Sequence, residues 1–232
     1  MVQKKHQVKA DPEVVIESAI GRTEMFIREN GKLLLGILAA VVIVVGGFFA
    51  YKYLYVGPRQ EKAATAMFQA QNYFAADSFE LALNGDGNAQ GFLQIVDKYG
   101  STPSGNLARH YAGQCYLRLG QYQEAVKYFD RYKDAKGIPA QLINAMNAGL
   151  TGDAYIQMGD LEKGVKMYEK AVSINDNQVT APYYSRKAGQ VYQQMGDYGK
   201  ALEWYRKVKN EYPGTMEWRD IDKYIGQVEQ KL

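Results

Sequence analysis

One pattern occurs three times in this chain and constrains its fold more than any other feature. It is carried by AGQCYLRLGQYQEAVKYFDRY (112–132), TGDAYIQMGDLEKGVKMYEKA (151–171) and AGQVYQQMGDYGKALEWYRKV (188–208), which start 39 and then 37 residues apart. In each copy a glycine is followed by a tyrosine three residues on and by a second glycine four residues later. Self-similarity at this period is typical of stacked helical hairpins.

The agreeing positions have the residue types that a helical hairpin needs where its helices meet. Small residues recur at Gly113, Gly152 and Gly189, where they would let the second helix approach the first closely. A second set of glycines falls at the expected turn, where a positive φ angle costs glycine little. The further equivalent sets are Tyr116, Tyr155 and Tyr192; the turn glycines Gly120, Gly159 and Gly196; Tyr122, Leu161 and Tyr198; Ala125, Gly164 and Ala201; and Phe129, Tyr168 and Tyr205.

This pattern resembles the tetratricopeptide repeat, whose 34-residue unit is a pair of antiparallel helices. The early aromatic position of that family is taken here by Arg109, Ala148 and Ser185, which predicts a thinner outer edge. Gly164 lies within a second helix, where glycine is about 1 kcal/mol less favourable than alanine, so we expect the middle repeat to be the softest. The resemblance implies repeats at about 106–139, 145–178 and 182–215.

Both flanks of the repeats have helical periodicity. In 59–99, apolar spacing is interrupted by ALNGDGNAQ and resumes in FLQIVDKY, as in a degenerate hairpin. In 216–232 an apolar stripe backed by charged residues predicts the capping helix that a repeat array needs at its end. We therefore predict an all-α solenoid over 56–232. The stripe of the capping helix consists of Trp218, Ile221, Ile225, Val228 and Leu232.

A single apolar segment precedes the repeats. LLLGILAAVVIVVGGFFAY (33–51) is 19 residues without a charge, and at ~1.5 Å per residue a helix of that length nearly spans a ~30 Å hydrocarbon core. Tyr51, Tyr53 and Tyr55 follow, as is typical of a membrane interface. A cleaved signal peptide is disfavoured, because 32 residues with five acids precede the segment and no small-x-small cleavage site follows it. We predict a transmembrane signal-anchor helix over 33–55, which places the chain in a lipid bilayer.

The basic residues around this segment predict its orientation. Six Lys or Arg residues precede it, whereas only Lys52, Arg59 and Lys62 lie within the ~15 residues that follow. The excess places the N-terminal segment, 1–32, in the cytoplasm and the repeats on the other side of the membrane.

The sequence offers little that could carry catalysis. Residues 57–232 hold 21 of the 28 basic and 20 of the 25 acidic residues, so the basic surface of a nucleic-acid binder is missing. His6 and His110 are the two histidines, with no metal-ligand spacing, and His110 is interpreted as a surface or groove residue. Cys115 is interpreted as a packed small apolar residue, and NGDGN (84–88) as a turn rather than a calcium loop. We therefore expect no enzymatic activity, metal, cofactor or small-molecule substrate.

The resemblance to tetratricopeptide repeats also implies where a partner would bind. In that family the concave wall is lined by residues of the first helix of each repeat. Carried over by register, the groove would be mixed and mainly uncharged, which suits extended or helical protein segments of loose sequence. The alternative is that the capping helix or an outer face binds instead. The predicted groove residues are Leu107, His110, Gln114, Leu117 and Arg118; Met146, Gly149, Asp153, Ile156 and Gln157; and Tyr183, Arg186, Gln190, Gln193 and Gln194.

The order of segments is similar to that of the bacterial YfgM-like family. FIRENGK (26–32) directly precedes the apolar segment, and YKYLYV then leads into the alanine-rich EKAATAMFQAQNYF. The resemblance implies a single-pass inner-membrane protein with a periplasmic repeat domain. It also implies an ancillary role at the Sec translocon, with contacts to translocon subunits, periplasmic chaperones and newly exported chains. The longer N-terminal segment, 1–25, and the repeat glycines depart from that pattern.

Three functions remain open at this point. The first is a membrane-anchored adaptor that docks on the translocon and receives chaperones or emerging chains. The second is an assembly factor for a cell-envelope complex, with one fixed protein partner in the same groove. The third is an accessory subunit that regulates an enzyme or sensor through residues 1–32. All three require protein binding, so the sequence does not separate them.

Overall fold

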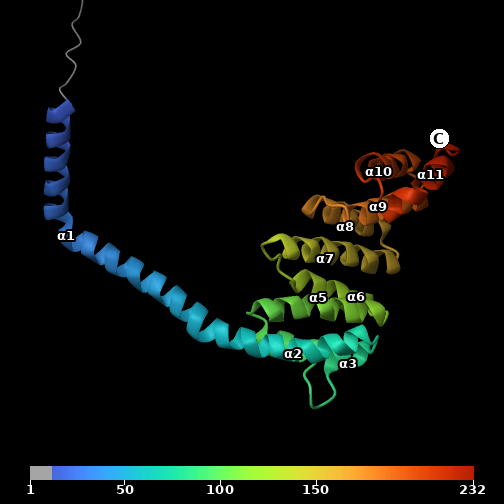
Figure 1. Cartoon of the computed structure of the whole chain (residues 1–232), viewed down its shortest axis with the longest axis horizontal. Helices are drawn as coiled ribbons and strands as arrows, with labels where there is room; N and C mark the ends of the chain where they lie inside the picture. The colour runs from blue at the N-terminus through green and yellow to red at the C-terminus, as the bar shows by residue number, and fades with distance from the viewer. Residues whose placement is uncertain (1–11) are drawn as a thin grey trace, which may run out of the picture. The chain divides into compact units, whose positions relative to one another are not determined.

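The computed structural model describes residues 12–232, and side chains from residue 25 onward. These residues divide into two compact units, with the boundary between Gly57 and Pro58. We describe the N-terminal unit and the helical domain, 58–232, separately (Figure 1). The first eleven residues of the predicted cytoplasmic segment, His6 among them, lie outside the described part of the chain.

The N-terminal unit is helical along its described length. Helix α1 (Pro12–Ala50) is followed by six residues of π-helix, η1 (Tyr51–Val56). The N–H of Gly57 donates to the carbonyl of Lys52, five residues back, which is the widened hydrogen-bond step of a π-helix. Among the described residues, Met25–Ala75 is the one helical run long and apolar enough to cross a membrane, and none of its most apolar window is buried.

The helical domain begins with three helices of unequal length. Helix α2 (Gly57–Ala75) is followed by the short α3 (Phe79–Asn84) and by α4 (Phe92–Tyr99). The sequence predicted a helix, a break and a second helix here, and α3 is an element that it did not predict. The interpretation of NGDGN as a turn is confirmed, because the Asp86 carboxylate accepts backbone N–H groups of Asn88 at 2.9 Å and Ala89 at 2.6 Å.

Three helical hairpins and a last helix complete the domain, and the predicted all-α solenoid is confirmed (Figure 1). Successive hairpins stack on one another, so each first helix contacts the second helix of its own hairpin and the helix that precedes it in the chain. The last helix packs against the third hairpin. The elements are α5 (Pro103–Arg118) with α6 (Tyr122–Arg131), α7 (Ile138–Gln157) with α8 (Leu161–Ile174), α9 (Ala181–Met195) with α10 (Tyr198–Glu211), and α11 (Met216–Glu229).

The turn inside each hairpin has the predicted glycine conformation. Gly120, Gly159 and Gly196 have φ angles of 75°, 82° and 80°, in the left-handed region that favours glycine. The next residue is the N-cap of the second helix. Asp160 and Asp197 each accept a backbone N–H at 3.1 Å, whereas the corresponding Gln121 makes no side-chain cap. The first hairpin therefore lacks a stabilising contact that the other two have.

Glycine also allows the two helices of each hairpin to approach closely. A Cβ atom placed on Gly152 would lie 2.8 Å from the Tyr168 ring, and the equivalent glycines of the other hairpins lie under Phe129 and Tyr205. Gly164 has a packing role as well, because its Cβ would lie 2.2 Å from Ile156 Cδ1 and 3.3 Å from the carbonyl of Gly152. Gly164 therefore lies at a close crossing of α7 and α8, as its place among the hairpin positions predicted.

The buried apolar side chains form two large clusters and a small one. The N-terminal core lies among α2–α5, the C-terminal core among α7–α11, and a middle cluster lies between them. The N-terminal core contains Met67, Ala70, Ala82, Leu83, Phe92, Ile95, Val96, Ala108, Ala112 and Cys115; the middle cluster contains Ala125, Phe129 and Ala154; the C-terminal core includes Val165, Tyr168, Tyr184, Tyr192, Tyr205, Ile221 and Val228.

Helix α11 covers the end of the C-terminal core with only part of its predicted stripe. Ile221, Ile225 and Val228 are buried, as expected. Trp218 is 39% exposed and its indole N–H donates to the carbonyl of Lys209 at 3.0 Å, while Leu232 is 72% exposed. Placing these two in the packed stripe was wrong, because Trp218 lies in the first turn of α11 and Leu232 beyond its end.

Candidate functional site

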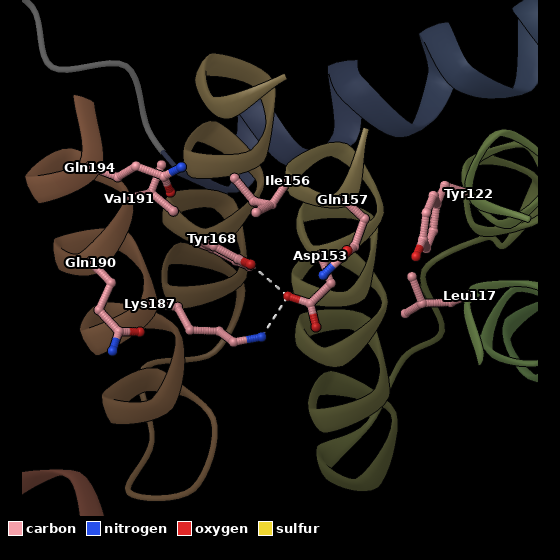
Figure 2. A pocket seen from close by; sticks show the side chains of 10 residues that line it. All are labelled: Leu117, Tyr122, Asp153, Ile156, Gln157, Tyr168, Lys187, Gln190, Val191 and Gln194. Atoms are coloured by element: carbon pink, nitrogen blue, oxygen red, sulfur yellow. Dashed lines mark hydrogen bonds and ion pairs between the residues drawn. The ribbon is translucent and has the colours of Figure 1, made fainter. Parts of the chain in front are cut away.

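An open depression of about 450 Å³ lies between the hairpins of the helical domain. Its walls come from α5 and α6 on one side and from α9 on the other, with α7 and α8 between them (Figure 2). We call it the groove. Its lining residues are Leu117, Tyr122, Asp153, Ile156, Gln157, Tyr168, Lys187, Gln190, Val191 and Gln194.

Asp153 organises the floor of the groove. Figure 2 shows Lys187 and Tyr168 pointing toward its carboxylate, and both contacts, the Lys187 Nζ ion pair and the Tyr168 hydroxyl hydrogen bond, measure 2.6 Å. The side chains of Lys187 and Asp153 are only 23% and 21% exposed. Burial, with the Asp153 carboxylate adding to it, raises the pKa of Tyr168, so the phenol stays protonated and donates.

The positive charge of Lys187 is shared with two aromatic rings. Its Nζ lies 4.9 Å from the ring centroid of Tyr183 and 5.4 Å from that of Tyr168. Such cation–π contacts add to the ion pair with Asp153 in holding the ammonium group in place. The floor is therefore polar but balanced in charge, and it does not favour a partner of either sign.

The rim of the groove offers amides and apolar side chains. The side-chain amides of Gln157, Gln190 and Gln194 make no hydrogen bond to the described residues, so their donors and acceptors are open to a partner. Leu117, Ile156 and Val191 supply apolar surface beside them.

The structure brings together six of the predicted groove residues. They come from α5, α7 and α9, the first helices of three successive hairpins, as the register carry-over expected. They are Leu117, Asp153, Ile156, Gln157, Gln190 and Gln194.

Four lining residues were missed by sequence reasoning. Lys187 and Val191 share a helix face with Gln190 and Gln194 at spacings of three and four, a signal that was available. Tyr122 and Tyr168 come from second helices, which a carry-over of first-helix positions does not reach.

The placement of His110 in the groove was wrong. Its side chain is 1% exposed and lies between the first two hairpins, with Nδ1 3.0 Å from Asn147 Oδ1. Gly149 is also buried, because the Tyr184 ring covers it.

The other predicted residues lie outside the lining of the groove. Leu107 packs against the N-terminal core, and Gln114 is half-buried. Arg118 pairs with Asp77 at 3.4 Å and lies over the Phe79 ring, on the side of α3. The Met146 carbonyl on α7 accepts a hydrogen bond from the Tyr184 hydroxyl, and the Gln193 side chain on α9 accepts one from the Tyr205 hydroxyl. The Tyr183 ring lies beside Lys187. Arg186 lines a separate small hollow with α11.

Metal and nucleophilic sites are not evident in the described residues. No group of three or more His, Cys, Asp or Glu side chains there could hold a metal ion. The interpretation of Cys115 as a packed residue is confirmed, since its side chain is fully buried. Burial raises the pKa of its thiol to about 12, so it is not a thiolate near neutral pH.

Two family profiles, both described as tetratricopeptide repeat, match the helical domain. One matches residues 91–137, and the other matches 150–178 and 181–214. The domain is a tetratricopeptide-repeat solenoid. The first match begins at residue 91 and so includes α4, ahead of the repeat start expected near residue 106.

Solved structures support the same fold for the tetratricopeptide-repeat domain. Nearly identical TPR-like repeats of a Podosopora anserina protein assigned as a kinesin light chain share 16% identity and a TM-score of 0.55, over 74% of this chain and 87% of that one. A crystal structure of MamA shares 16% identity and a TM-score of 0.50, over 70% of this chain and 93% of that one. No curated protein matched the chain.

Proposed function

We propose that this protein is a membrane-anchored adaptor that binds protein segments in the groove of its tetratricopeptide-repeat domain. The observation that carries this proposal is the groove itself. Its floor is balanced in charge by the Asp153–Lys187 pair, and its rim presents amides that the described residues leave unpaired.

The groove chemistry favours an extended polypeptide of loose sequence. Each glutamine amide has both donors and an acceptor, which match the N–H and C=O groups of a backbone. The apolar surface of Leu117, Ile156 and Val191 can take side chains without demanding a particular one. A partner read mainly through its backbone would include many different chains.

The apolar segment 33–55 would anchor the adaptor in the bacterial inner membrane. Its support is the length and composition of the helix, together with the lack of burial of its most apolar window. The excess of basic residues before it favours a cytoplasmic N-terminus and a periplasmic repeat domain.

The resemblance to the YfgM-like family indicates the partners. We propose that the adaptor is an ancillary Sec-translocon subunit that contacts periplasmic chaperones or newly exported chains. An assembly factor with one fixed envelope partner is the second candidate, since it would need the same anchor and a groove in the same place. The number of different partners separates the two.

Site-specific photo-crosslinking in intact cells tests the groove and its partners together. A photoreactive amino acid at Gln190 lies on the groove, and the matched control at Lys166 is exposed on the second helix α8, away from the lining. We expect adducts with translocon subunits, chaperones or several exported proteins at 190 and not at 166. A single adduct at 190 with one unrelated envelope protein would favour the assembly factor, and equal labelling at both positions would contradict binding in the groove.

Topology is tested with a membrane-impermeant maleimide. Cys115 is buried, so we replace it by alanine and introduce Glu203→Cys on the exposed side of α10. Labelling in spheroplasts with an intact inner membrane supports a periplasmic domain. Labelling only after lysis would contradict it.

A further inference from the structure

His110 lies at the junction between the first and second hairpins and is almost completely buried. It projects from α5 and is 1% exposed. Its ring centroid lies 6.0 Å from that of Phe129 and 5.8 Å from that of Tyr132, both at the end of the first hairpin. Across the junction it contacts Asn147 of α7.

The hydrogen bonds at this junction fix the state of the ring. Asn147 Nδ2 donates to the carbonyl of Phe129 at 3.0 Å, so Asn147 Oδ1 is the acceptor that faces His110 Nδ1 at 3.0 Å. Nδ1 therefore carries the proton in the neutral ring. Nε2 is buried and has no hydrogen-bond partner among the described residues, so it is an unprotonated acceptor.

Protonation of Nε2 would place both an N–H donor and a positive charge where nothing receives them. The neighbouring phenol rings are Tyr111 on α5, whose ring centroid is 6.0 Å away, and Tyr132. Burial raises the pKa of Tyr132, so it supplies no negative charge near neutral pH. The nearest charged residue on α5 is Arg109, which donates to Gly100 and Asn106 instead. On α7 the facing group is the neutral amide of Asn147. A buried charge without a partner is strongly unfavourable.

The junction has few fully buried apolar residues to oppose such a loss, and the other apolar side chains packed there are only partly buried. The middle cluster contributes only Ala125, Phe129 and Ala154 as buried apolar residues. A second polar contact joins the same two hairpins, where the hydroxyl of Tyr132, at the end of α6, donates to Asn144 Oδ1 of α7 at 2.8 Å. Leu117 and Tyr122 of the groove lie on the first side of this junction, and Asp153 and Ile156 lie on the second.

We propose that His110 is a proton-sensitive lock between the first and second hairpins. The ring must be neutral for α5 to pack on α7, and acidification loosens the junction and separates the two walls of the groove. The statement about the groove rests on the proposed function, whereas the lock itself does not.

The direction of the effect follows from proton linkage. In an opened junction the ring is hydrated and titrates near 6.5, whereas burial lowers the pKa of packed His110, with the Asn147 hydrogen bond opposing that shift. Above about pH 6.5 both states are neutral and the lock is fully effective. As the pH falls below that value, the proton binds the open state first, and the opening equilibrium constant rises up to about tenfold per pH unit.

Hydrogen exchange of the full chain in lipid nanodiscs measures the opening directly. With exchange corrected for its intrinsic pH dependence, we expect the opening of α5 and α6 to rise up to about fivefold between pH 6.5 and 5.5, with α9 and α10 unchanged as the internal reference. The His110→Asn variant keeps a donor for Asn147 and has no titrating ring, so it should lose the pH step. An equal rise in α9 and α10, or a pH step that persists in His110→Asn, would overturn the lock.

Two further measurements test the proposal independently of the His110→Asn variant. The chain has two histidines, so an NMR titration distinguishes the ring of His110 from that of His6; a packed His110 that titrates near 6.5 would overturn the lock even if the variant fails to fold. Crosslinking yield from Gln190 at the two pH values tests the groove. If hydrogen exchange rises at the lower pH but the crosslinking yield does not fall, the link between the lock and the groove is wrong. If adducts are absent at both pH values, the proposed function is contradicted, while the exchange result still tests the lock.

Discussion

The two junctions between successive hairpins are built from different chemistry. Where α5 meets α7, the contacts are hydrogen bonds through His110 and Asn147 among few buried apolar residues. Where α7 meets α9, the Tyr184 ring lies directly over Gly149 and stacks on Tyr168 at a centroid distance of 5.9 Å. We call the first the polar junction and the second, where the Asp153–Lys187 ion pair lies beside the packed rings, the aromatic junction.

The two junctions should therefore respond differently to pH and to substitutions. A buried hydrogen-bond network is stable only while each member keeps its partner, so it responds to protonation and to the loss of one group. Aromatic packing depends on shape, so it is insensitive to pH near neutrality and sensitive to added volume. The polar junction therefore depends on its hydrogen-bond partners, whereas the buried rings of the aromatic junction depend on shape complementarity.

The largest effect is expected at the aromatic junction from Gly149→Ala. The new Cβ would lie 1.9 Å from Tyr184 Cζ, a ring carbon that cannot turn aside within the C-terminal core. We expect a loss of about 3 kcal/mol or more in the free energy of unfolding, measured by chemical denaturation. Gly226→Ala on α11 is the matched control, since nothing lies within 4 Å of its Cβ. A similar stability for both variants would break the comparison.

At the polar junction, Asn147→Leu should cost about 2 kcal/mol, because the His110 Nδ1–H and the Phe129 carbonyl both lose their partner. The double variant His110→Leu with Asn147→Leu should regain part of this loss, since it also removes the donor left unpaired. A double-mutant cycle from urea unfolding measures the coupling. Additive single effects would show that the two side chains do not act as a network.

A smaller gain is expected at the turn of the first hairpin from Gln121→Asp. The substitution gives α6 the side-chain N-cap that Asp160 and Asp197 provide for α8 and α10. We expect about 0.5–1 kcal/mol of added stability, read as a higher Tm. Gln121→Ala should show no gain, and a gain as large in that variant would mean that capping is not the cause.

The smallest effect is expected from Gly164→Ala. Alanine gains about 1 kcal/mol in helix propensity, but its Cβ would lie 2.2 Å from Ile156 Cδ1, the flexible end of a side chain that can move. The two terms should nearly cancel, within about 1 kcal/mol, in the same denaturation assay. A loss as large as that of Gly149→Ala would mean that the hairpin crossing is as rigid as the aromatic junction.

Much of the fold could be predicted from the sequence, because repetition shows which positions are structural. The glycines at 120, 159 and 196 have the turn conformation that their period indicated. The short α3 could not be predicted in the same way, since FELALN has no counterpart in the repeats and its Ala82 and Leu83 are buried only through the packing of neighbouring helices.

The groove could be predicted only in part. The repeat register places a residue on a given helix, but it does not show whether the side chain is buried between hairpins or exposed in the groove. His110 occupies a first-helix position, yet the polar side chain of Asn147 and the rings around it draw it into the junction. Tyr168 was predicted only as an equivalent position of the repeats, and its hydroxyl reaches the groove because Asp153 accepts from it. Both outcomes depend on pairs of residues far apart in the sequence.

The division of the buried residues into separate cores has a consequence for the order in which the domain folds during synthesis. All fully buried residues of the N-terminal core precede residue 116, whereas the C-terminal core also needs Ile221, Ile225 and Val228. Domains fold progressively as the chain is made, and contacts between sequence neighbours form fastest. The N-terminal helices can therefore fold during synthesis while the third hairpin still lacks α11. During that interval the aromatic face that α11 will cover stays open to whatever lies nearby.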